Sequence, residues 1–137
     1  MIRPIMDKQF FLKQPSVEAT AADIATARDL AETLKAHHAT CVGMAANMIG
    51  ERKRIIAVLD EAGNILTMLN PEIVDCKQPY NATEGCLSLP GERETLRYER
   101  ITVSYQDEAM QVIKRSFKGR VAQAIQHEID HCNGILI

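Results

Sequence analysis

The sequence predicts an α+β fold, with mostly antiparallel strands in small sheets packed around a C-terminal helix and a further helix near the N-terminus. Two observations lead to this class. Apolar residues recur at helical spacing at both ends of the chain, in residues 20–38 and 121–132. Between them lie short β-rich runs separated by turn residues, without the strand-and-helix alternation of a parallel sheet. We expect residues 1–137 to form one domain, since this length suffices for a single core.

The composition excludes several classes of protein. The net charge of -2 gives no indication of bulk binding to nucleic acid or to an acidic membrane. The apolar runs are too short to span a bilayer, and the N-terminus lacks the apolar stretch of a secretory signal. We therefore expect a cytoplasmic protein with no membrane partner. Its cysteines should be free thiols or metal ligands rather than disulfides, at positions Cys41, Cys76, Cys86 and Cys132.

The N-terminal third predicts an arm followed by a helix. Residues 1–19 are irregular, and we expect them to dock through Phe10, Phe11 and Leu12. A helix should open at Thr20 or Ala21 and run to about residue 38. The apolar positions at helical spacing are Ile24, Ala27, Leu30, Ala31 and Leu34.

The middle of the chain predicts a series of short strands. Proline and glycine should interrupt them: Asn70 and Pro71 break one strand, residues 78–81 form a loop, and Pro90 and Gly91 argue against a central strand. Residues 135–137 form a last short strand or a tail. The expected strands are residues 54–59, 65–69, 72–76, 100–105 and 110–117.

The C-terminal helix carries the strongest chemical signal, an H-E-x-x-H motif at residues 127–131. Histidines at i and i+4 lie one turn apart on one face, so His127 and His131 can hold one metal ion. Glu128 can act as a general base toward a metal-bound water. Five residues can also match by chance, and the alternative is a solvated helix with two surface histidines.

The helical phase favours the metal-binding interpretation. On a helical wheel Glu128 falls inside the apolar arc and the two histidines lie at its edge, while Gln123, Gln126 and Asp130 hold the opposite side. Burial of Glu128 would raise its pKa, which suits a group that takes and returns a proton. Gly134 supplies a helix stop.

A catalytic metal site of this kind takes three protein ligands, so a third must come from elsewhere. No His, Asp or Glu follows His131, and the third ligand must therefore lie upstream. Cys86 is the best candidate, between a glycine and a Leu-Ser-Leu-Pro run. Cys132 lies in the apolar arc and is interpreted as a buried hydrophobe. The residues alone leave open whether Cys86 binds metal or is structural.

Three segments together resemble the peptide deformylase family. Its E-G-C-L-S motif stands at residues 84–88, and its Q-H-E-x-D-H motif at residues 126–131. Its G-x-G-x-A-A-x-Q loop is partly preserved at residues 41–48, as Cys-Val-Gly-Met-Ala-Ala-Asn-Met. The intervening lengths also fit, so the resemblance covers most of the chain. It implies an enzyme that removes the N-formyl group from the initiator methionine of nascent peptides and releases formate.

The resemblance also implies roles for individual residues. Cys86, His127 and His131 would hold the metal, Fe(II) in the cell, with zinc or nickel possible in purified protein. Glu128 would move the proton, and the Leu87 backbone N–H would face the developing oxyanion. The peptide would bind extended, like an added strand, against Gly43. Arg93 would lie at the rim of the peptide site, and Glu84 would orient the metal site.

The chain departs from the family at Met48, which replaces a glutamine whose amide is the second oxyanion donor. Methionine has no such donor, and we hypothesise that the neighbouring Asn47 amide reaches the same oxygen. Cys41 replaces the first glycine, and Arg120 and Gln123 replace residues that line an apolar methionine pocket in relatives. Two alternatives stay open: an inactive paralogue that binds metal or formyl peptides, and a zinc peptidase using the same helix.

The expected partner is the formyl-methionyl peptide, with no sequence-specific nucleic acid. Many relatives carry a C-terminal helix that docks some of them to the ribosome. This sequence lacks that helix, so the resemblance leaves ribosome association open.

Overall fold

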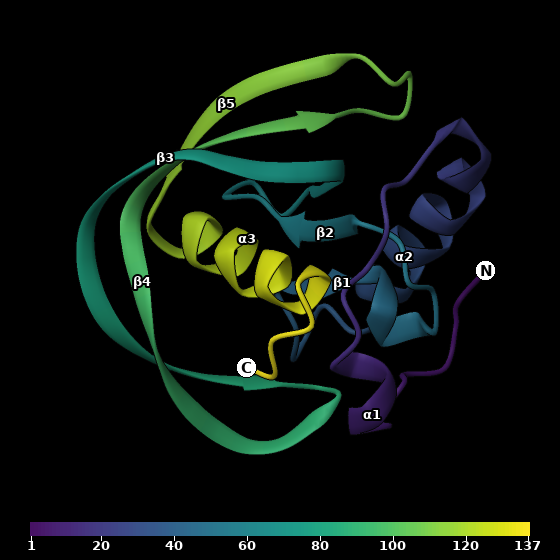
Figure 1. Ribbon diagram of the computed structural model, residues 1–137, viewed down its shortest axis with the longest axis horizontal. Helices are drawn as coiled ribbons and strands as arrows, with labels where there is room; N and C mark the ends of the chain where they lie inside the picture. Colours follow the sequence, from purple (N-terminus) through teal and green to yellow (C-terminus); the bar gives the residue numbers. More distant parts are fainter.

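One antiparallel sheet runs through the whole molecule (Figure 1). In the computed structural model, which describes residues 1–137, its strands follow the order β1-β2-β3-β4-β5. The predicted α+β class is confirmed, although the expected small sheets are joined into one. The strands are β1 Gly43–Ala45, β2 Ile55–Leu59, β3 Ile65–Cys86, β4 Leu89–Gln106 and β5 Val112–Lys118. The helices are α1 Gln9–Leu12, α2 Ile24–Ala36 and α3 Gly119–Cys132, with 3₁₀ turns η1 Ala21–Asp23 and η2 Ala46–Ile49.

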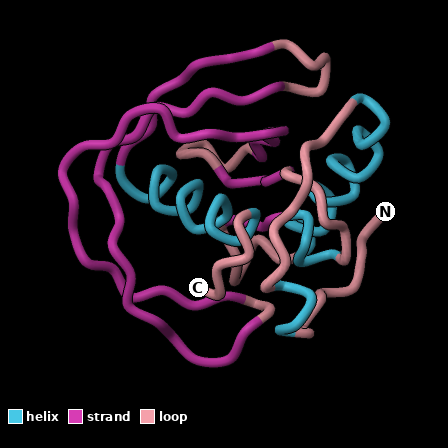
Figure 2. The backbone as a smooth tube through the Cα atoms, in the orientation of Figure 1, coloured by secondary structure: helices cyan, strands magenta, loops and turns pink.

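The long strands β3 and β4 form a hairpin that curves around one side of α3 (Figures 1 and 2). The predicted break at Asn70 and Pro71 is wrong, because β3 continues through them with a shift in register between Leu69 and Glu72. The predicted loop at 78–81 is also wrong, since Pro79 pairs with Tyr98. Beyond Leu69, β3 pairs only with β4. Its other edge is free there, so a proline costs no ladder hydrogen bond.

Two apolar clusters lie on opposite sides of β2. Ile56 and Val58 pack in the cluster that includes α3, whereas Ile55 and Ala57 pack in the cluster that includes α2. This alternation follows from the two-residue period of a strand. Because both faces of β2 are buried, its sequence is apolar throughout, as a central strand requires.

Helix α3 is buried on nearly every side. Ten of its 14 residues are buried, including Gln126, which we expected on the polar side. The Gln126 side chain accepts a hydrogen bond from the backbone N–H of Tyr98 and donates one to its carbonyl. The expectation is wrong because β4 covers the face that the helical pattern assigns to solvent. As expected, the helix stops near Gly134, which has a φ of 76°.

The N-terminal arm docks through fewer residues than expected. Leu12 is fully buried in the one-turn helix α1, but Phe10 is 82% exposed. Helix α2 ends at Ala36, slightly before the expected end. Residues 135–137 form a tail rather than a strand, and Ile137 is buried. No helix is long and apolar enough to cross a membrane.

Candidate metal centre

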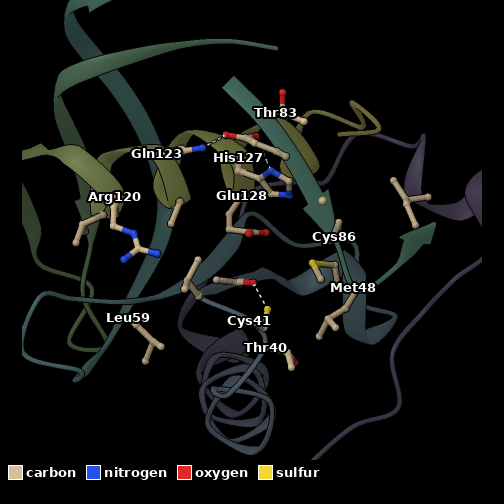
Figure 3. A pocket seen from close by; sticks show the side chains of 18 of the residues that line it. Thr40, Cys41, Met48, Leu59, Thr83, Cys86, Arg120, Gln123, His127 and Glu128 are labelled. Atoms are coloured by element: carbon tan, nitrogen blue, oxygen red, sulfur yellow. Dashed lines mark hydrogen bonds and ion pairs between the residues drawn. The ribbon is translucent and has the colours of Figure 1, made fainter. Parts of the chain in front are cut away.

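A cavity of about 910 Å³ opens between the end of β3, the edge strand β1 and one face of α3 (Figure 3). Its lining includes Gly43, Met48, Cys86, Leu87, His127 and Glu128. Cys86, His127 and Glu128 reach this space from segments far apart in the sequence.

Three potential ligand atoms converge at the inner end of this cavity. The sulfur of Cys86 and one ring nitrogen each of His127 and His131 lie within 4.8 Å of one another. The two histidine Nε2 atoms are 3.0 Å apart, as expected for residues one helical turn apart. Cys86 ends β3 and pairs with Leu89 across a tight turn. The backbone N–H of Ser88 in that turn donates to the Cys86 sulfur at 3.4 Å.

A buried network fixes the orientation of His127. Its Nδ1 lies 2.8 Å from the carboxylate of Glu84, which also accepts hydrogen bonds from Arg97 and from Gln123. Arg97 in turn pairs with Asp130 at 2.7 Å. With Nδ1 held by Glu84, the Nε2 atom of His127 is directed at the converging ligands.

The charge of Glu84 survives its burial. Burial acts to raise the pKa of this carboxyl, but the hydrogen bonds from His127, Arg97 and Gln123 outweigh it and lower the pKa to about 2. Glu84 is therefore an anion at neutral pH and can stabilise positive charge on the His127 side of the site.

The pKa of Glu128 is shifted in the opposite direction from that of Glu84. It is only 4% exposed, and its Oε1 atom has no hydrogen-bond partner. Burial is the main cause that raises its pKa to about 7. A carboxyl with a pKa near neutrality can both accept and return a proton.

The donor set fits a divalent transition metal. Burial lowers the pKa of His131 to about 3, so its ring stays neutral and keeps a lone pair for an ion. Burial also acts to lower the pKa of His127, but the charges of Glu128 and Glu84, with Cys86, raise it to about 10. The negative groups that favour a proton on His127, namely Glu128, Glu84 and Cys86, would also favour a metal cation at this position. One sulfur and two imidazoles form a set that binds zinc or iron.

Several of the other predicted residues line the cavity, namely Cys41, Gly43, Glu84, Leu87, Arg120 and Gln123. Gly43 lies on β1, where an added Cβ would approach the Oε2 atom of Glu128 to 3.0 Å. Leu87 is 39% exposed and its backbone N–H makes no hydrogen bond within the protein. Both positions leave room for a ligand beside the converging histidines.

Asn47 and Arg93 are not among the residues that line the cavity. The Asn47 amide donates to the carbonyl of His131 at 2.9 Å, so it supports the metal-binding helix and is not directed at the oxygen that we hypothesised. Arg93 donates to the carbonyl of Pro90 at 2.7 Å. Met48 does line the cavity, and its sulfur accepts the N–H of Ala45 at 3.4 Å.

Arg97 is the residue that the sequence reasoning missed. It is 3% exposed and holds both Glu84 and Asp130. The sequence gives no direct signal for this role, because the exposed Glu99 interrupts the alternation of Ile101 and Val103 in β4 before it reaches residue 97. A buried arginine at that position demands an acidic partner.

The whole chain is similar to known proteins of one family. A family model described as polypeptide deformylase matches residues 2–137. A peptide deformylase of Clostridium beijerinckii is 48% identical over 137 residues, covering all of both chains. A peptide deformylase of Dictyoglomus thermophilum is 43% identical over 112 residues, covering 81% of this chain and 71% of the relative.

Solved structures agree in fold. The peptide deformylase of Thermus thermophilus superposes with a TM-score of 0.86 at 34% identity, covering 99% of this chain and 83% of that one. A class I type b peptide deformylase of Acinetobacter baumannii with Met-Ala-Ser bound gives a TM-score of 0.88 at 28% identity, covering 99% and 97%.

Proposed function

Because this chain belongs to the polypeptide deformylase family, we propose that Cys86, His127 and His131 hold the divalent ion of its reaction. The protein is a metal-dependent hydrolase that removes the N-formyl group from formyl-methionyl peptides. The single observation that carries the residue assignment is the convergence of the three ligand atoms beside a buried, unpartnered Glu128 carboxylate.

A divalent ion at this position would acidify a water molecule and polarise the formyl oxygen. Side-chain and backbone groups of the protein would carry out the proton transfer and stabilise the oxyanion. Glu128 accepts the proton of the attacking water and returns it to the leaving amine, which its pKa of about 7 permits. The free N–H of Leu87 donates to the developing oxyanion.

The substrate peptide binds along the outer edge of β1. This strand is the edge of the sheet, with a paired neighbour on one side only, so an extended peptide can add to it at Gly43. Met-Ala-Ser binding by the Acinetobacter enzyme supports a peptide of this class. Arg93 contacts the peptide at the rim, and we assign Asn47 to the support of His131 rather than to the oxyanion.

Iron(II) is the metal we propose for the cell, with zinc or nickel as substitutes in purified protein. Zinc and iron both fit one thiolate with two imidazoles. We further propose that residues 1–137 act as one domain in the cytoplasm, where the nascent formyl peptides arise. The match of the family model to residues 2–137 supports the single domain.

Formate release from formyl-Met-Ala-Ser by anaerobically prepared Fe(II) protein tests this proposal. We expect turnover that stops on chelation, and a loss of about 10²–10⁴ in kcat for Glu128→Gln with the metal still bound. No formate above the metal-free protein would contradict the assignment. Cleavage of the peptide bond without formate release would instead identify a peptidase.

A further inference from the structure

Three cations lie in a row across β3, β4 and β5. Lys77 is the direct partner of Arg100, and Arg100 is the direct partner of Lys118. Directly opposed residues in an antiparallel ladder point to the same face of the sheet. We call Lys77, Arg100 and Lys118 the cationic row.

The cationic row faces away from α3 and the metal cavity. Ile101 and Phe117, the sequence neighbours of Arg100 and Lys118, are buried in the cluster that includes α3. Side chains alternate along a strand, so the row lies on the opposite, outer face. There it lines a groove of about 440 Å³ together with Thr102 and Ser116, whose hydroxyls are 2.9 Å apart, and with one carboxylate, that of Asp75.

The row carries positive charge that the protein itself does not neutralise. Like charges directly opposite each other in a sheet are destabilising. Lys77 has one acidic neighbour, Asp75, at 3.9 Å, but both side chains are more than half exposed. A pair of that kind contributes little. Arg100 and Lys118 have no carboxylate within 4.0 Å.

We propose that this groove binds the phosphate backbone of single-stranded RNA. Arginine, lysine and the hydroxyls of serine and threonine are the side chains that contact nucleic-acid phosphates. Neighbouring strands are about 4.8 Å apart, so the row extends over about 10 Å and can meet successive phosphates. The only aromatic ring in the groove, Phe117, is buried, so binding involves no base stacking and is independent of sequence.

The chain as a whole is slightly negative, so it would not attract RNA outside a local cluster of cations. A net charge of -2 provides no general attraction for a polyanion, so the attraction must come from a local cluster. The metal cavity lies at the other end of the β3–β4 hairpin and shares no lining residue with the groove. Bound RNA therefore leaves the peptide site open, and neutralising the row should leave formate release unchanged.

Fluorescence anisotropy with labelled poly-uridine RNA tests the proposal in the metal-loaded protein. The test variant is Lys77→Gln/Arg100→Gln/Lys118→Gln. The control is Lys8→Gln/Lys13→Gln/Lys35→Gln, which removes the same charge from exposed positions outside the groove. All six side chains are exposed, and unchanged formate release from formyl-Met-Ala-Ser confirms that both variants fold.

We expect salt-dependent RNA binding that weakens about tenfold or more in the row variant and stays near wild type in the control. The slope of log affinity against log salt should fall by about 2, because three phosphate contacts are lost. Three results would overturn the proposal: no RNA binding by the unaltered protein, equal weakening in both variants, or tighter binding of poly-glutamate than of RNA. Pyrophosphate that competes as strongly as RNA would overturn the assignment to a nucleic-acid backbone.

Discussion

Met48 lines the metal cavity with a side chain that cannot donate a hydrogen bond. By resemblance, a glutamine amide at this position is the second oxyanion donor of the family. Asn47 does not line the cavity, and its amide donates to the carbonyl of His131. In the proposed function, the Leu87 N–H would then be the donor on which the oxyanion depends, and the rate should be limited accordingly.

We predict that Met48→Gln raises kcat for formate release, by up to about 10²–10³. The glutamine oxygen can accept the Ala45 N–H that the Met48 sulfur now accepts, which leaves its amide nitrogen for the cavity. Met48→Leu is the matched control and should show no gain. An unchanged kcat in Met48→Gln would show that a second donor is already present.

Gly43 is the residue whose missing side chain gives Glu128 its position. We predict that Gly43→Ala lowers kcat strongly while the metal content stays the same. The new Cβ would lie 3.0 Å from Oε2 and 3.1 Å from Cγ of Glu128, closer than ordinary van der Waals contact. Steady-state kinetics with metal analysis checks this. Full activity in Gly43→Ala would show that catalysis tolerates a displaced Glu128 side chain.

The ionised carboxylate of Glu84 should make the free energy of unfolding depend on pH in the acid range. Its pKa in the folded protein, about 2, lies below its ordinary value of 4.5, despite the opposing effect of burial. Its contribution to folding is therefore complete above about pH 4.5 and is lost as the pH falls toward about 2. The shift corresponds to at most on the order of 3 kcal/mol.

We predict that the metal-free protein loses free energy of unfolding between pH 4.5 and 2, and that Glu84→Gln flattens this dependence. Urea unfolding over this pH range measures it. Exposed Glu94→Gln serves as the control, because its carboxyl makes no hydrogen bond or ion pair. An identical acid profile in Glu84→Gln and the unaltered protein would contradict the role of the network.

At the scale of elements, the long hairpin of β3 and β4 positions the site and is also where the sequence was hardest to interpret. Helix α3 and strand β2 follow local patterns that the sequence displays directly. The 22-residue continuity of β3 does not, because Asn70 and Pro71 have the composition of a turn. Tertiary contacts decide the outcome at Asn70, whose side chain bonds both backbone groups of Ala19.

We predict that Asn70→Ala lowers the free energy of unfolding by about 1–3 kcal/mol. The Asn70 amide also donates to Gln106 at 2.7 Å, and its φ of 52° is one that asparagine tolerates better than alanine. Asn81→Ala, at an exposed position of the same strand, is the control and should change little. Denaturant unfolding compares the two, and equal stability of both variants would contradict the prediction.

At the scale of the whole molecule, the site joins parts of the chain that no local pattern connects. The helical spacing of His127 and His131 is visible in the sequence, and so is the apolar phase that buries Glu128. The approach of Cys86 is not, because it depends on where a long curved strand ends relative to α3. From the residues alone, the role of Cys86 as a metal ligand or a structural residue was undecided. Only the family resemblance identified it as the third ligand.

X-ray absorption spectroscopy of the zinc-loaded protein tests that assembly most directly. The proposed centre predicts one sulfur at about 2.3 Å and two imidazole nitrogens at about 2.0–2.1 Å from the metal. It also predicts that the sulfur shell disappears in Cys86→Ala and persists in Cys41→Ala. A spectrum of the unaltered protein without sulfur, or with sulfur that survives Cys86→Ala, would contradict the account.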